Sequence, residues 1–128
     1  MRIVDSVGWV AYLTGGPMAD RYEEFIVSPD DLLTPAIVVY EVYRHVYRAS
    51  GEAGGKIALS ALIKTRIVPM ASGLAVAAAQ VGIDRRLPLV DSIIYATALA
   101  LEATLVTSDA HFEGLPQVEF IPRPAGGS

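Results

Sequence analysis

The sequence predicts an α/β fold, a three-layer α/β/α sandwich with a small central parallel sheet. Short runs rich in β-branched residues alternate with longer stretches whose apolar residues recur at helical spacing. Successive strands are separated by enough chain for two helices, and such crossovers make strands parallel with helices on both faces. With 52% hydrophobic residues, this 128-residue chain can bury a core of its own.

The first half of the chain is expected to begin with a strand over residues 2–4. Ser6 is expected to cap a helix that runs through Leu13 and stops at Gly15 and Gly16. Thr34 and Pro35 form a similar start, a cap followed by proline at the first helical position, and Gly51 ends that helix. The other elements expected here are a helix over 18–26, a brief strand over 32–33 and a helix over 52–65.

The second half is expected to supply the remaining strands of the sheet. The expected elements are strands over 66–69, 104–107 and 119–121, and helices over 72–83 and 89–102. The length suits one domain, predicted over residues 1–122, followed by a flexible tail over 123–128.

Composition excludes several kinds of function. The chain has no cysteine, which removes disulfides, thiolate metal sites and a cysteine nucleophile. His45 and His111 lie too far apart for a zinc-binding H-E-x-x-H helix. A net charge of −4 excludes a protein that binds nucleic acid simply by being strongly basic. The longest apolar stretch, near 93–101, is too short to cross a bilayer, and no signal peptide is visible, so we expect a cytoplasmic protein without membrane association.

Four acidic residues fall where the predicted topology places a ligand crevice. Asp5 follows the first strand and Asp109 follows the strand ending at Thr107, while Asp91 and Glu41 lie in early helical turns. If the four converge, their repulsion requires protons or a cation, and oxygen ligands suit Mg²⁺ or Mn²⁺. Each acid also has a purely structural interpretation: helix cap, helix-dipole partner, turn former, or surface partner of a base three or four residues on.

Four separated motifs surround these acids: Ile3-Val4-Asp5-Ser6 with Trp9, Thr34-Pro35 leading to Tyr40-Glu41-Val42, Leu89 to Ala98, and Leu105 to Phe112. In this order and spacing they resemble the motifs of the PIN-domain family, and most of all those of the VapC toxins of prokaryotic toxin–antitoxin pairs. The resemblance implies a metal-dependent endoribonuclease that uses Mg²⁺ or Mn²⁺ and leaves a 5′-phosphate. It also implies a cognate VapB-type antitoxin as partner.

The resemblance assigns roles residue by residue. Asp5, Glu41, Asp91 and Asp109 match the catalytic and metal-binding acids, and Ser6 and Thr107 match supporting positions. Ser92 departs from the family, which commonly has alanine there, and its extra hydroxyl is expected to alter the surroundings of the metal. His111 is either a general base or a polar loop residue. The basic residues that we expect to track RNA phosphates are Arg44, Arg48, Arg85 and Arg86.

Some alternatives stay open at this point. Tyr40, Tyr43 and Tyr47 share one helix face, which predicts either a homodimer or antitoxin surface or burial inside the monomer. Trp9 and Phe112 are expected in the core rather than as base-stacking platforms. A solitary PIN nuclease in RNA processing and a non-catalytic PIN-like scaffold that binds a protein are the competing functions.

Overall fold

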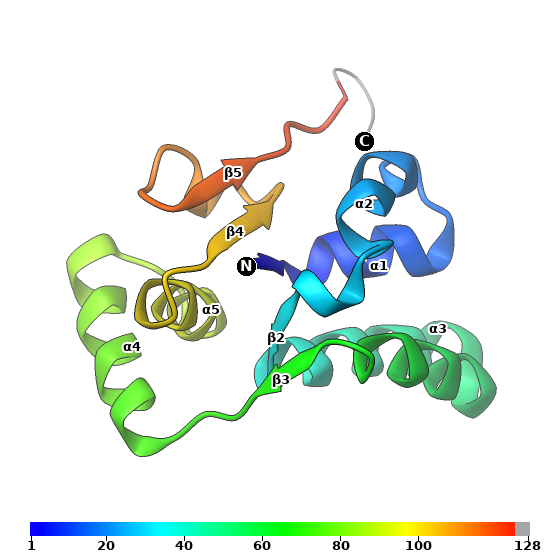
Figure 1. Cartoon of the computed structure of the whole chain (residues 1–128), viewed down its shortest axis with the longest axis horizontal. Helices are drawn as coiled ribbons and strands as arrows, with labels where there is room; N and C mark the ends of the chain where they lie inside the picture. Colours follow the sequence, from blue (N-terminus) through cyan, green and yellow to red (C-terminus); the bar gives the residue numbers. More distant parts are fainter. Residues whose placement is uncertain (125–128) are drawn as a thin grey trace.

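The chain folds as an α/β/α sandwich around a small parallel sheet, seen in a computed structural model that describes residues 1–124 (Figure 1). The last four residues of the predicted tail, 125–128, lie outside the described residues. The α1–α2 pair lies on one side of the strands and the α4–α5 pair on the other. The predicted boundary of the domain at residue 122 stays a prediction.

The sheet consists of two parallel groups of strands. One has the order β1-β4-β5 and the other pairs β2 with β3. A parallel bridge between Arg2 and Leu32 joins the two groups. The strands are β1 (Arg2–Val4), β2 (Leu33–Pro35), β3 (Arg66–Val68), β4 (Thr104–Thr107) and β5 (Val118–Phe120).

Register brings the segments that carry two predicted site residues, Asp5 and Asp109, to one edge of the sheet. Ile3 of β1 lies opposite Leu105 of β4, so both strands run in the same direction and end side by side. The residues after them, Asp5 and Ser108, therefore emerge at the same edge. Parallel strands that are buried on both faces have continuous apolar sequences. This explains why Ile3-Val4 and Leu105-Val106 are apolar at consecutive positions, and all four side chains are buried.

The first two helices, α1 (Ser6–Thr14) and α2 (Ala19–Ile26), are joined by a short turn. Gly15 ends α1 in the left-handed conformation, with φ of 68°. The expected cap at Ser6 is wrong by one residue, because the Asp5 carboxylate accepts the Ser6 backbone N–H as the N-cap. A 3₁₀ turn, η1 (Pro29–Asp31), then leads into β2.

The long helix α3 (Ala36–Leu62) carries a kink at Gly51, whose φ of 75° and ψ of −167° lie outside the helical region. The helix break expected there is thus a kink between two helical halves. Thr34 does not cap α3, since it is part of β2 and its hydroxyl pairs with that of Thr65 at 2.6 Å. Val38, Val42 and Val46 are buried and form the side of α3 that faces the core.

The last pair of helices, α4 (Ser72–Arg85) and α5 (Leu89–Ala100), is packed through small residues. Ala78 of α4 meets Ile93 and Ala96 of α5 in a small apolar cluster. The 3₁₀ turn η2 (Ala110–Phe112) follows β4. Phe112 and Trp9 are buried in the main core, as predicted. None of the helices described is long and apolar enough to cross a membrane.

Gly8 fixes how closely α1 approaches α2. A Cβ atom at position 8 would overlap the buried ring of Tyr22. We expect Gly8→Ala to cost about 1–3 kcal/mol by overpacking and to lower Tm by roughly 4–12 °C in calorimetry. Gly73→Ala in α4 is the matched control, because a Cβ there meets nothing within 4 Å. Equal melting temperatures for the Gly8 variant and the parent would contradict this packing.

Candidate active site

Asp5 occupies the junction between β1 and α1 and is only 4% exposed. One of its oxygens accepts the Ser6 backbone N–H at 2.7 Å, and the other accepts the Thr107 hydroxyl at 2.6 Å. Burial raises the pKa of Asp5, and the negative charges of Asp109 and Glu41 add to that rise. Asp5 is therefore both a helix cap and a buried acid with other acids nearby.

Thr107 ties the end of β4 to two of these acids. Its fully buried hydroxyl donates to Asp5 and accepts the backbone N–H of Asp109 at 3.0 Å. This double role orients the Asp5 carboxylate and the loop that carries Asp109. The geometry fits the supporting role expected for Thr107.

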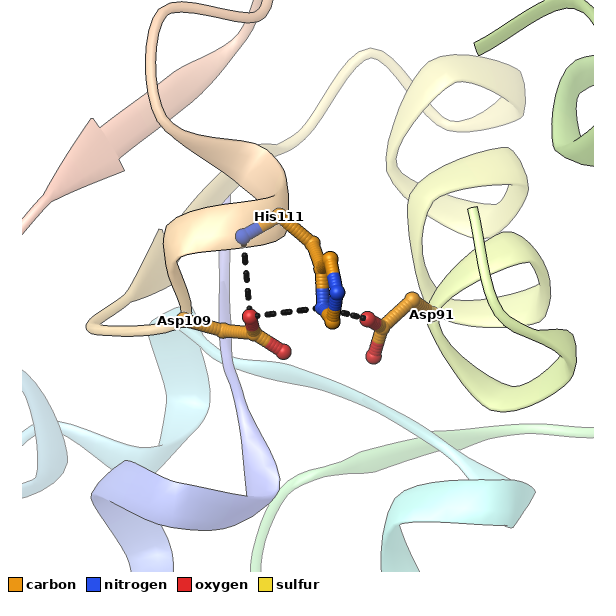
Figure 2. Close-up of side chains that lie close together, drawn as sticks. All are labelled: Asp91, Asp109 and His111. Atoms are coloured by element: carbon orange, nitrogen blue, oxygen red, sulfur yellow. Dashed lines mark hydrogen bonds and ion pairs between the residues drawn. The ribbon is translucent and has the colours of Figure 1, made fainter. Parts of the chain in front are cut away.

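Asp109 and Asp91 lie on either side of the His111 imidazole (Figure 2). Asp109 caps η2 by accepting the His111 backbone N–H at 2.9 Å. The imidazole Nδ1 is 3.0 Å from Asp91 Oδ2 and 3.0 Å from Asp109 Oδ1. Asp91 comes from the first turn of α5, so two distant segments meet at one ring.

Glu41 reaches the same region from the second turn of α3. Its Oε1 accepts the Ser6 hydroxyl at 2.5 Å. The alternative pairing of Glu41 with Arg44 or His45 is absent from the ion pairs of residues 1–124. Ser6 thus serves two acids, Asp5 through its backbone and Glu41 through its side chain.

A single chain of contacts links all four predicted acids. It runs from Glu41 through Ser6 to Asp5, then through Thr107 to Asp109, and through His111 to Asp91. Burial, followed by the charges of Asp109 and Asp5, raises the pKa of Asp91 to about 7. Such mutual repulsion is relieved by a proton or a cation.

The donor atoms fit a divalent cation. Asp91, Asp109 and His111 each offer one ligand atom, and the three atoms lie within 4.8 Å of one another. The charge of Glu41 helps raise the pKa of Asp5, and the charge of Asp5 helps raise that of Asp91, so both acids interact with this set. Carboxylate oxygens suit Mg²⁺ and Mn²⁺, whose charge would offset the burial and the repulsion that raise the pKa of Asp91.

Ser92 does not act as expected near the cluster. Its hydroxyl donates to the backbone carbonyls of Pro88 at 2.8 Å and Leu87 at 3.2 Å, which turns it toward the α4–α5 connection. A Cβ at Gly82 would overlap this hydroxyl. The serine is therefore accommodated by a glycine on α4, and the expectation that it alters the surroundings of the metal is wrong.

The tyrosine face of α3 is not buried in the monomer. Tyr40 is 60% exposed and Tyr47 is 51% exposed, and the ring of Tyr47 stacks on Tyr43 with centroids 5.8 Å apart. The burial alternative is therefore wrong for Tyr40 and Tyr47, which are available to a partner.

A groove of about 450 Å³ starts at Ser6 and Glu41 and is lined by Arg44 and Arg48, two of the basic residues predicted from the sequence. Arg85 and Arg86, the other two, do not line it; they end α4. Sequence reasoning missed Arg123, which also lines the groove although it falls in the predicted tail. No local pattern marks Arg123, since only the tertiary fold returns it to α1.

The sequence also did not single out a buried hydroxyl pair behind the cluster. The Tyr22 hydroxyl lies 2.5 Å from Ser108 Oγ, next to Asp109 in the chain. Burial raises the pKa of Tyr22, and the charge of Arg123 opposes that rise. The pair connects α2 to the loop that carries Asp109.

Comparison with known proteins gives one family and a consistent fold. The model of the PIN domain family matches residues 2–117. No curated protein matches the sequence. Among solved structures, a toxin–antitoxin complex from Klebsiella pneumoniae is similar with a TM-score of 0.80 and 22% identity, over 93% of this chain and 96% of that one.

Two further structures share the fold. VapC20 of Mycobacterium tuberculosis, a toxin that cleaves the Sarcin-Ricin loop, has a TM-score of 0.69 and 17% identity over 81% of this chain and 85% of its own. VapBC2 of Rickettsia felis, bound to a DNA fragment from its promoter, has a TM-score of 0.72 and 15% identity over 94% of this chain and 97% of its own.

Proposed function

The chain belongs to the PIN domain family, and on that premise we propose that it is a metal-dependent endoribonuclease, the toxin of a toxin–antitoxin pair. The observation that carries the proposal is the continuous set of contacts that joins four acids from four separate segments. A merely structural role for each acid would not require Glu41 and Asp91 to reach the same cluster.

We propose that Asp5, Asp91 and Asp109 hold Mg²⁺ or Mn²⁺, with Glu41 beside them. When bound, such an ion lowers the pKa of a water and offsets charge that develops on a phosphate. The His111 imidazole lies 3.0 Å from both Asp91 and Asp109, so it is a candidate ligand as well as a residue that holds the two carboxylates.

The chain's own residues set the geometry of this site. Thr107 holds Asp5 by one oxygen while the start of α1 holds the other, so the carboxylate cannot rotate freely. Ser6 fixes Glu41 against the N-terminus of α1. Orientation of this kind aligns a substrate phosphate with the groups that act on it. Hydrolysis would leave the phosphate on the 5′ side of the product.

The toxin assignment is supported by the similar structures, which include toxin–antitoxin complexes. We propose a VapB-type antitoxin as the partner and action on RNA in the cytoplasm, where such a target lies. A homodimer stays a prediction, to be checked by light scattering of the purified chain. A solitary PIN nuclease would cleave RNA but have no inhibitor, and a scaffold would bind a protein without cleaving.

Cleavage of total RNA by the purified chain tests the proposal. We expect products with Mg²⁺ or Mn²⁺ and none with a chelator, because the acids alone repel a phosphate. End-mapping of the products should find 5′-phosphates and report the sequence that is cut. Equal cleavage with and without chelator would contradict metal dependence, and no cleavage with either ion would favour the scaffold.

A further inference from the structure

A buried hydrogen bond joins α2 to the loop that carries Asp109. The Tyr22 hydroxyl lies 2.5 Å from Ser108 Oγ, and Ser108 Oγ lies 3.9 Å from Met18 Sδ. A serine hydroxyl has one proton, which here faces the sulfur, so Tyr22 is the donor of the pair. Tyr22 is 0% exposed and Ser108 is 3% exposed, so neither hydroxyl can be reached by a substrate.

The Tyr22 hydroxyl is not needed to pack α2. The other buried residues of this helix, Phe25 and Ile26, are apolar, and a phenylalanine ring would fill the space of Tyr22. Gly8 leaves room for the ring, because a Cβ there would overlap it. A hydroxyl in such a core has to find a partner, and this one finds it only in Ser108 among the hydrogen bonds of residues 1–124. The hydroxyl therefore contributes a specific tie rather than apolar contact.

Ser108 is the middle one of three residues that are each held by a different segment. Thr107 donates to Asp5 at the β1–α1 junction, and Ser108 accepts from Tyr22 of α2. Asp109 accepts the His111 backbone N–H and so caps η2. The loop between β4 and η2 is thus fixed from two sides before it presents the Asp109 carboxylate.

The position of this carboxylate decides whether a cation can be held. The ligand atoms of Asp91, Asp109 and His111 lie within 4.8 Å of one another, and Asp109 Oδ1 is 3.0 Å from His111 Nδ1. The place of Asp109 relative to β4 depends on the backbone dihedral angles of Ser108, the residue between them. Groups that orient a metal ligand typically change metal affinity by about 10- to 100-fold when they are removed.

We propose that Tyr22 and Ser108 are positioning residues for the metal site. The Tyr22 hydroxyl holds Ser108, and this contact fixes the loop that presents Asp109 to a divalent cation. The proposal rests on the nuclease function proposed above and extends its site to α2. Neither residue contacts the substrate or the ion, since both are buried and act through the backbone of the loop.

Manganese binding to the purified chain tests this role without RNA. Tyr22→Phe combined with Ser108→Ala deletes both hydroxyls and leaves neither unpaired, a change that can be nearly neutral for stability. We expect the metal-free Tm of this double variant to stay close to the parent's, and the Kd for Mn²⁺ in titration calorimetry to rise about tenfold. Tyr22→Phe alone should raise the Kd equally, because it deletes the donor, so the two substitutions should not be additive.

Cleavage kinetics give a second measurement of the same effect. The Mn²⁺ concentration for half-maximal cleavage should rise by the same factor as the Kd. KM for RNA and kcat at saturating Mn²⁺ should stay close to those of the parent, since neither hydroxyl reaches the substrate. A purely structural role would instead lower the metal-free Tm and leave the Kd for Mn²⁺ unchanged.

The hydroxyl pair of Thr34 and Thr65 is a matched control. Both threonines are buried, their oxygens are 2.6 Å apart, and no hydrogen bond of residues 1–124 joins either side chain to an acid. Thr34→Val combined with Thr65→Val therefore deletes the same kind of contact elsewhere in the fold. This variant should bind Mn²⁺ with the affinity of the parent.

The outcomes separate this proposal from the nuclease function. A parent that binds neither Mn²⁺ nor Mg²⁺ and does not cleave RNA ends both proposals. An unchanged Kd in the Tyr22 and Ser108 variants, or an equal rise in the threonine control, overturns the positioning role while the nuclease function stands. If the double variant does not fold, Tyr22→Phe alone decides by the same criterion. A rise in Kd that is confined to the Tyr22 and Ser108 variants supports the proposal.

Discussion

Replacing Asp5 with asparagine is expected to abolish RNA cleavage and leave the fold intact. Asp5 is the buried acid to which Ser6 and Thr107 both donate, and its charge lies beside those of Asp109 and Glu41. An amide has the shape of the carboxylate but not its charge, so it removes the attraction for a cation while filling the same space.

Local hydrogen bonding explains why the fold should survive Asp5→Asn. The amide oxygen can still accept the Ser6 backbone N–H, and the amide nitrogen can donate to Thr107 Oγ1. Burial raises the pKa of Asp5, which means that its charge is unfavourable in the metal-free protein. Removing that charge should leave the metal-free Tm unchanged or raise it.

Initial rates on the mapped RNA site measure this effect. Asp84→Asn is the matched control, because Asp84 is exposed on α4 and takes no part in the contacts that join the four acids. Cleavage by Asp5→Asn above about a tenth of the parent's rate, a barrier increase below about 1.4 kcal/mol, would show that Asp5 is not essential. The control should cleave like the parent.

Strand ends were the features from which the sequence could predict the site. Asp5 and Asp109 each follow an apolar β-branched run, and parallel pairing of β1 with β4 brings both to one edge. Glu41 could be placed on a helix face by its spacing from Val38 and Val42, but its contact with Ser6 depends on how α3 packs against α1.

Helix caps and the position of Arg123 could not be predicted from the sequence, because they depend on contacts between distant segments. Asp5 and Ser6 are both good helix caps, and only the buried contact of Asp5 with Thr107 decides between them. Thr34 before a proline is typical of a helix start, yet its buried hydroxyl pairs with that of Thr65, the residue that precedes β3. Arg123 has no local signal, because its position in the groove follows from the path of the chain after β5.

The stability of the metal-free protein should fall as pH rises from about 4 to about 7. The folded-state pKa of Asp91 is raised from 3.8 to about 7, so within this range the folded protein binds a proton that the unfolded chain has released. Folding is therefore favoured at the acidic end and loses that contribution as Asp91 ionises. Asp5, whose pKa is also raised, acts in the same direction.

A divalent cation should reverse this fall in stability with rising pH, because it neutralises the carboxylate charge that the proton neutralises at lower pH. At a hundred times its Kd, Mg²⁺ or Mn²⁺ that binds only the folded protein adds about 2.7 kcal/mol, or roughly 10 °C in Tm. The increase should be largest near about pH 8, where the carboxylates are ionised, and shrink toward about pH 5.

Thermal denaturation across pH, with chelator and with metal, measures both effects. Asp91→Asn should flatten the metal-free pH dependence and remove most of the metal-induced rise, since it deletes both the titrating group and a ligand atom. Asp84→Asn should keep both. The contrary result is a parent protein whose Tm does not change with saturating metal at about pH 8. The four acids would then tolerate their repulsion without a cation, and metal-dependent cleavage by this cluster would have no physical basis.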